Sequence, residues 1–139
     1  MEKPNRRNAR ENAFIRLFAL AFPGAGQDDV QQAELDEEYP LDTYIQACFC
    51  YCVEHLEQID SLILPKLKSW TLERLPKVSL TILRLATAEL LFGGEDGKEM
   101  DSIVINEAVE LAKKYGDGED YQFINGVLGS IVREQKAGS

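Results

Sequence analysis

The chain has 139 residues, of which 45% are hydrophobic and 28% are charged, and its formal net charge at pH 7 is −9. This length favours one domain, or two small halves that share a core. The hydrophobic content is sufficient for such a core and excludes general disorder. The acidity argues against a general nucleic-acid coat protein, because phosphate affinity comes largely from Lys and Arg.

The positive charge gathers at the amino terminus. Residues 1–10 carry four cations and a single acid, whereas no Lys or Arg lies between Arg16 and Lys66. A basic start on an acidic body predicts a local contact with an anion, and not a generally adhesive surface.

Apolar residues at helical spacing predict four helical segments in the first half of the chain. We expect these to span about residues 6–22, 28–39, 42–56 and 60–65. Asp42 or Thr43 can cap the third segment by accepting hydrogen bonds from free backbone N–H groups.

The second half begins with a connector, Trp70–Pro76, that reads as a single helical turn. Ser79 is then predicted to cap a deeply buried helix that ends at Gly93. A helical hairpin follows over Asp101–Val132, with a glycine-marked turn at Gly116. No alternation of period two is present, so the predicted fold class is all-α, with about seven helices.

An arginine cluster, Arg6, Arg7 and Arg10, opens the first predicted helix. Guanidinium groups neutralise phosphates and stack on bases, which suits single-stranded RNA. Phe14 and Phe18 follow one and two turns beyond Arg10 and could supply a stacking surface. The alternative is a solvated basic chain end with core phenylalanines behind it.

The three cysteines and the histidine do not predict a metal site. Cys48, Cys50, Cys52 and His55 lie on one predicted helix, and the sequence has no other Cys or His to complete a zinc site. Small apolar side chains of this kind pack well in a core. We therefore expect core residues and no cofactor.

Catalytic motifs are also missing from the sequence. A single histidine leaves no obvious Ser/His/Asp set, and no phosphate-binding loop of the G-x-x-x-x-G-K type occurs. No apolar run approaches the roughly 20 residues that span a bilayer. These observations predict a cytoplasmic protein that is not an enzyme and does not enter the membrane.

Two asparagines, Asn106 and Asn125, lie inside the predicted hairpin helices, where asparagine is intrinsically unfavourable. We expect each to make a side-chain hydrogen bond within the hairpin. Gly126 lowers helix propensity by about 1 kcal/mol relative to alanine, which predicts that another backbone packs closely there.

Taken together, these segments resemble the NusB family of transcription antitermination factors. The residues that carry the resemblance span most of the chain in order: RRNARE at 6–11, WTLERL at 70–75, ILRLA at 82–86, EL at 89–90, INEAVELAK at 105–113 and FINGVL at 123–128.

The resemblance implies two small packed helical bundles, with halves at about residues 1–66 and 67–135. It implies that the protein pairs with NusE, a small-subunit ribosomal protein, and binds the single-stranded boxA element of nascent ribosomal RNA transcripts. It further implies assembly with other Nus factors on RNA polymerase. Whether the free protein is a monomer or a homodimer stays open.

The resemblance also assigns site residues. Those expected to meet RNA are Arg6, Arg7, Arg10, Phe18, Tyr115, Glu119, Gln122 and Phe123. Those expected near NusE are Ser79, Leu80 and Leu83. Asn8 interrupts the arginine run, and Ser79 stands where an acid is common in relatives. The acids of the hairpin turn would repel phosphate, so Glu119 is expected either to contact a base or to limit unspecific binding.

Two other functions remain open from the sequence. One is a protein-binding adaptor that uses the acidic region 27–60 and does not touch RNA. The other is a stand-alone relative of the helical domain at the front of some ribosomal-RNA cytosine methyltransferases.

Overall fold

The computed structural model describes residues 4–20, 29–68, 71–92 and 101–137. Within these ranges the chain is helical and contains no strand, which confirms the predicted all-α class. The described elements are α1 (Arg6–Leu20), α2 (Asp29–Glu38), α3 (Thr43–Glu54), α4 (Leu56–Ile63), the 3₁₀ turn η1 (Leu64–Lys66), α5 (Lys77–Phe92), α6 (Asp101–Tyr115) and α7 (Asp120–Ala137).

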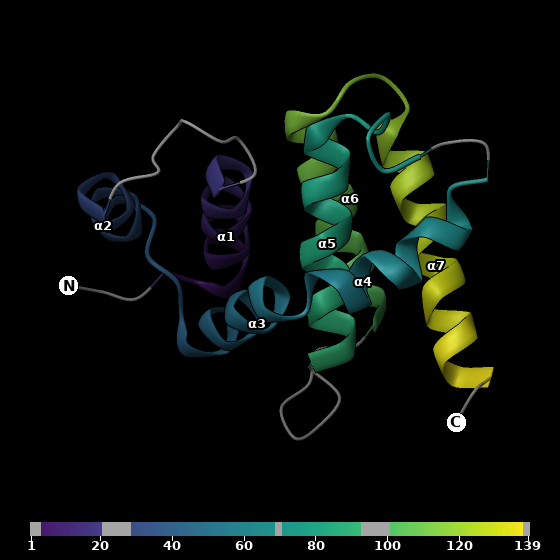
Figure 1. The fold of residues 1–139 in the computed structure, drawn as a ribbon, viewed down its shortest axis with the longest axis horizontal. Helices are drawn as coiled ribbons and strands as arrows, with labels where there is room; N and C mark the ends of the chain where they lie inside the picture. The colour runs from purple at the N-terminus through teal and green to yellow at the C-terminus, as the bar shows by residue number, and fades with distance from the viewer. Residues whose placement is uncertain (1–3, 21–28, 69–70, 93–100, 138–139) are drawn as a thin grey trace.

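Helix α5 is the centre of the molecule. It packs against α1, α3, α4, α6 and α7. Figure 1 shows α1 to α3 grouped apart from the α6–α7 hairpin. The sequence explains this place, because apolar and small residues cover most of the helix circumference. Even Thr81 and Thr87 are buried.

One continuous core joins the two groups of helices. Buried apolar side chains from α1, α3, α4, α5, α6 and α7 form a single cluster. Ile59, Leu83 and Leu128 lie at its centre and have no exposed surface. Burying such a side chain contributes roughly 1.5–3 kcal/mol relative to leaving it in water.

The predicted helix cap at Asp42 and the predicted helix end at Gly116 are confirmed. The Asp42 carboxylate accepts a hydrogen bond from the backbone N–H of Ile45 at 2.7 Å and so caps α3. At Gly116, the last turn of α6 closes onto the Ala112 carbonyl, and a Cβ atom would lie 2.7 Å from that oxygen. Only glycine therefore fits this turn without a backbone shift.

Several predicted boundaries are wrong. Helix α4 begins at Leu56, ahead of the expected start near Asp60, because the chain breaks only at His55. Helix α5 begins at Lys77, so Ser79 is a buried residue of its first turn and not its cap. Of the predicted connector, Trp70 lies outside the described residues, and residues 71–76 make the expected turn, in which the Leu75 N–H donates to the Thr71 carbonyl at 3.2 Å.

Arg16 fastens the end of α2 to α1, a role that its sequence did not indicate. Its guanidinium donates hydrogen bonds to the backbone carbonyls of Tyr39 and Asp36, at 2.8 and 2.9 Å, and is almost fully buried.

None of the helices in the described part of the chain is long and apolar enough to cross a membrane.

Candidate nucleic-acid interface

The arginine cluster begins on a capped helix end. The Asn5 side chain accepts a hydrogen bond from the backbone N–H of Asn8 at 2.8 Å, and the Asn5 carbonyl accepts one from Ala9 at 2.8 Å. These bonds fix the first turn of α1, which carries Arg6 and Arg7. Asparagine directly before an apolar helical pattern is a cap signal that could have predicted this role for Asn5.

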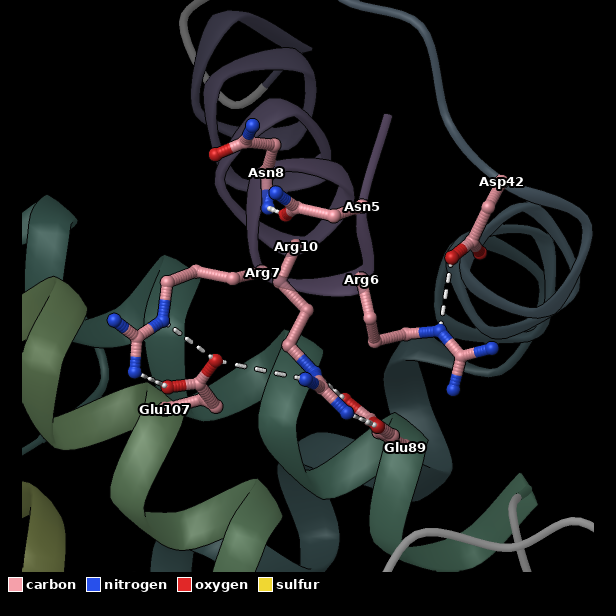
Figure 2. A network of polar contacts seen from close by, with 8 residues as sticks. All are labelled: Asn5, Arg6, Arg7, Asn8, Arg10, Asp42, Glu89 and Glu107. Atoms are coloured by element: carbon pink, nitrogen blue, oxygen red, sulfur yellow. Dashed lines mark hydrogen bonds and ion pairs between the residues drawn. The ribbon is translucent and has the colours of Figure 1, made fainter. Parts of the chain in front are cut away.

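Arg6 points away from the other two arginines, toward the start of α3 (Figure 2). Its Nε atom donates to the Asp42 carboxylate at 2.8 Å, and its guanidinium lies over the Tyr44 ring, 4.4 Å from the centroid. Because Asp42 also caps α3, Arg6 ties the start of α1 to the start of α3.

Arg7 is the most exposed arginine of the cluster, with a side chain 69% exposed. It donates two hydrogen bonds to the Glu107 carboxylate of α6, at 3.0 and 2.9 Å. These hydrogen bonds and the charge of Glu107 raise the pKa of Arg7. The exposed Arg7 guanidinium can be reached by another anion, but that anion must compete with Glu107, whose own side chain is only 11% exposed.

Arg10 lies in a different environment. It donates two hydrogen bonds to Glu89 of α5, at 2.9 and 2.6 Å, and its side chain is only 9% exposed. Glu107 lies 3.7 Å from the same guanidinium (Figure 2). A phosphate could reach Arg10 only if this buried pair opened. The burial of Arg10 therefore favours a role in positioning α1 over the predicted direct contact with RNA.

A groove of about 310 Å³ runs between α1 and α6 beside these arginines. Its walls carry Arg7, Arg10 and Lys114, but also the acids Glu11, Glu107 and Glu110. The cations of the expected RNA surface are therefore balanced by carboxylates of the protein itself. An anionic ligand must compete with these internal partners.

The structure brings Phe18 and Tyr115 to the same aromatic cluster. Phe14 lies between them, with its ring centroid 5.8 Å from that of Phe18 and 4.9 Å from that of Tyr115. Tyr115 is 37% exposed and Phe18 is half-buried. The end of α6 thus meets the middle of α1, as expected if both line one site.

Glu11 secures this contact between α1 and α6. It accepts a hydrogen bond from the Tyr115 hydroxyl at 2.7 Å and forms an ion pair with Lys114. The Lys114 hydrogen bond is the main cause of a lowered pKa at Glu11. No local sequence signal predicts this pairing, because its partners lie more than a hundred residues apart in the chain.

The remaining predicted RNA residues lie on the turn between α6 and α7 and beyond it. Glu119 and Gln122 are exposed, and Phe123 is half-buried. The Asp120 carboxylate accepts a hydrogen bond from the Asp117 N–H at 2.9 Å and so holds the turn. Gln122 and Phe123 face a second groove, between η1 and α7, and not the groove beside Arg7.

The three residues expected near NusE differ in accessibility. Ser79 and Leu83 are 1% and 0% exposed, inside the core. Leu80 is partly exposed and packs against the core from outside. Of the three, only Leu80 can touch a partner without rearrangement of α5.

The expected role of the hairpin asparagines is wrong. Asn106 and Asn125 are both exposed, and neither side chain makes a hydrogen bond within the described part of the chain. Gly126 is exposed as well, and a Cβ atom added there would meet nothing within 4 Å. The predicted close backbone contact at Gly126 is therefore also wrong.

The cysteines follow the core prediction in part. Cys48 and Cys52 are buried, and burial raises the pKa of each thiol to about 12. Cys50 is exposed on the opposite face of α3. Among the described residues, no three His, Cys, Asp or Glu side chains gather as ligands for a metal ion.

Comparison with solved structures gives the same fold. The structure of Thermotoga maritima NusB is 35% identical, covers 96% of this chain and 94% of its own, and superposes with a TM-score of 0.80. A crystal structure of the antitermination factors NusB and NusE in complex with double-stranded RNA contains a chain that is 31% identical. That match covers 93% of this chain and 96% of the other, with a TM-score of 0.76.

Sequence comparison agrees over the same length. The transcription antitermination protein NusB of Macrococcus caseolyticus is 49% identical over 94% of this chain and 98% of its own length. The NusB of Exiguobacterium sp. strain AT1b is 41% identical over 93% and 98%. The NusB family model matches residues 7–133. This chain therefore belongs to the NusB family of antitermination factors, and it is not an enzyme.

Proposed function

We propose that this protein binds single-stranded, boxA-like RNA of nascent ribosomal RNA transcripts jointly with NusE. With other Nus factors it then forms an antitermination complex on RNA polymerase in the cytoplasm. One observation carries the RNA part of the proposal: exposed Arg7 and the partly exposed aromatics Phe18 and Tyr115 lie along the same junction of α1 with α6. Proteins bind single-stranded RNA with cations that contact its phosphates and with aromatic rings that stack on its bases.

Binding would proceed by exchange of anions. Arg7 would leave Glu107 for a phosphate, and Lys114 would leave Glu11. Each exchange yields less net free energy than a phosphate meeting an unpaired cation, so the protein alone binds RNA modestly. NusE would add a second contact surface on the same RNA and increase the joint affinity.

The NusB–NusE structure that contains a similar chain was solved in complex with double-stranded RNA. We favour single-stranded RNA here because accessible rings can stack only on bases that are not already paired. Tyr115 presents such a ring at the end of α6. NusE would contact the protein near the exposed part of Leu80.

The test is a fluorescence titration of a boxA-type RNA, with and without NusE. We expect Arg7→Ala to weaken binding and to lower the slope of log K against log salt by about 0.7, the value for one lost phosphate contact on a single strand. Arg74→Ala is the matched control, because Arg74 is also exposed but lies on the turn before α5. It should leave both quantities unchanged.

Three results would overturn the proposal. No RNA binding with or without NusE would leave a protein-binding adaptor. Equal losses for Arg7→Ala and Arg74→Ala would indicate unspecific attraction to charge. Equal affinity for a duplex of the same sequence would exclude recognition of the single strand.

A further inference from the structure

A second groove, of about 540 Å³, lies between η1 and the middle of α7. Three cations line it, Lys66, Lys68 and Arg133, and its lining contains no carboxylate. The groove between α1 and α6 differs, since three acids share its walls with the cations. The charged residues that line this groove are thus all cations, in a chain with a net charge of −9. Such a local excess of positive charge suits an anionic ligand.

Two of these cations are available for a ligand. Lys66 forms an ion pair with Glu134. In contrast, no hydrogen bond or ion pair joins Lys68 or Arg133 to another residue in the part of the chain that the structure describes. A phosphate at these two side chains would therefore displace no carboxylate of the described residues.

The backbone at Lys68 is strained. Its φ angle is +59°, in the left-handed region that side chains other than glycine rarely adopt. Glycine or asparagine would adopt this conformation at lower cost than lysine. Such outliers gather at binding sites, where a side chain must be held in one direction.

The far wall of the groove provides a surface for a base. Phe123 is half-buried there, with Gln122 beside it as a hydrogen-bonding group. Gly126 lies in the same wall, and a Cβ atom would meet no protein atom within 4 Å. Protein packing therefore does not require glycine at this exposed helical site, whereas a ligand lying against the helix would.

We propose that this groove is an RNA subsite, in which Lys68 and Arg133 hold phosphates and a base lies against Phe123. The inference rests on the proposed function and lengthens its site, because Gln122 and Phe123 belong to both. The bound RNA would thus extend from the arginine cluster over the turn between α6 and α7 and into the groove between η1 and α7.

The test compares Lys68→Gln and Arg133→Gln with a matched control, Lys136→Gln. Lys136 lies on the same helix as Arg133 but lines a different groove. We expect each of the first two variants to lower the salt slope of RNA binding by about 0.7, and the pair by about 1.4. The control should match the wild type.

Two further variants test the shape of the groove. Gly126→Leu should weaken RNA binding strongly by filling the groove, and Gly126→Ala should weaken it less, because one methyl group takes up less of the space between the helix and the RNA. Circular dichroism and thermal melting check that every variant is folded. Progressive shortening of the RNA from each end should reach a length below which wild type and Lys68→Gln bind equally.

The outcomes separate the two proposals. If wild type binds no RNA, the proposed function fails. If Arg7→Ala weakens RNA binding while Lys68→Gln and Arg133→Gln do not, only the groove inference is wrong. If these two variants weaken binding of NusE and not of RNA, the groove is a protein contact and the inference is again wrong.

Discussion

Arg10 and Glu89 form a two-bonded ion pair that joins α1 to α5 across the core, at 2.9 and 2.6 Å. Their side chains are only 9% and 6% exposed. Burying two charges costs desolvation free energy. The attraction and the two hydrogen bonds of the pair offset that cost, but add little net stability. The main effect of the pair is therefore to fix the orientation of α1 on α5. That orientation in turn sets the positions of Arg7 and Phe18.

Glu89→Ala should destabilise the protein strongly, because it removes the carboxylate that accepts two hydrogen bonds from the buried Arg10 guanidinium. We expect a loss of about 3–5 kcal/mol in the free energy of unfolding, measured by urea denaturation. Replacing both partners, Arg10→Met with Glu89→Leu, should restore most of that loss. A small effect of Glu89→Ala alone would show that water reaches Arg10 in the folded protein.

The burial of Arg10 could have been inferred from the sequence. Arg10 extends backwards the apolar stripe of Ala13, Phe14 and Leu17, so it lies on the core face of α1. Its partner could not be inferred, because the pairing with Glu89 depends on how two helices cross. Helix signals encoded in neighbouring residues, such as Asp42 and the helix stop at Gly116, were predicted correctly for the opposite reason: their partners lie within four residues.

The hairpin asparagines show a different limit of sequence reasoning. Their low helix propensity predicts compensation inside the protein, yet Asn106 and Asn125 are exposed, and a Cβ atom at Gly126 would meet no atom within 4 Å. Propensity indicates that a residue is costly for folding. It does not tell whether the compensation comes from the fold or from a partner.

Glu107→Gln should tighten RNA binding, because Glu107 is the internal competitor for Arg7. The variant keeps a hydrogen-bonding group but removes the negative charge that a phosphate must displace. The measurement is RNA affinity at several salt concentrations. Glu110→Gln is the control for general charge, since Glu110 lines the same groove and faces Lys113 at 3.9 Å. Equal effects of both variants would contradict the specific exchange.

Glu119→Gln separates the two roles proposed for that exposed residue. If Glu119 limits unspecific binding, the variant should bind RNA more tightly and discriminate less between boxA-type and scrambled sequences. If Glu119 accepts a hydrogen bond from a base, the variant should bind boxA-type RNA more weakly and leave scrambled RNA unaffected. Parallel titrations of the two RNAs decide between these outcomes, and no change in either would remove Glu119 from the site.

The cysteines should differ sharply in reactivity. Burial raises the pKa of Cys48 and Cys52 to about 12, so near pH 8 only Cys50 should react with a thiol reagent in the folded protein. All three should react in denaturant. The raised pKa values favour the folded state below the unfolded thiol pKa of about 8.5, and this contribution should decline as pH rises above it. Native labelling of Cys48 or Cys52 at the same rate would show that α3 opens.

The contact of Glu11 with Lys114 and Tyr115 should give a pH-dependent term to stability. The Lys114 hydrogen bond lowers the pKa of Glu11 in the folded protein, so the contact stabilises the folded state above the unfolded pKa of about 4.3. That contribution should be lost as pH falls through the lowered folded value. We expect Glu11→Gln to lower Tm by a constant amount at pH 6–7, and the difference from wild type to shrink below about pH 4.

Glu134→Gln removes the acid that pairs with Lys66 and serves as the control, since it leaves the contact between α1 and α6 intact. A Tm difference for Glu11→Gln that persists at acidic pH would mean that packing of Tyr115, and not the charge of Glu11, holds the end of α6 against α1.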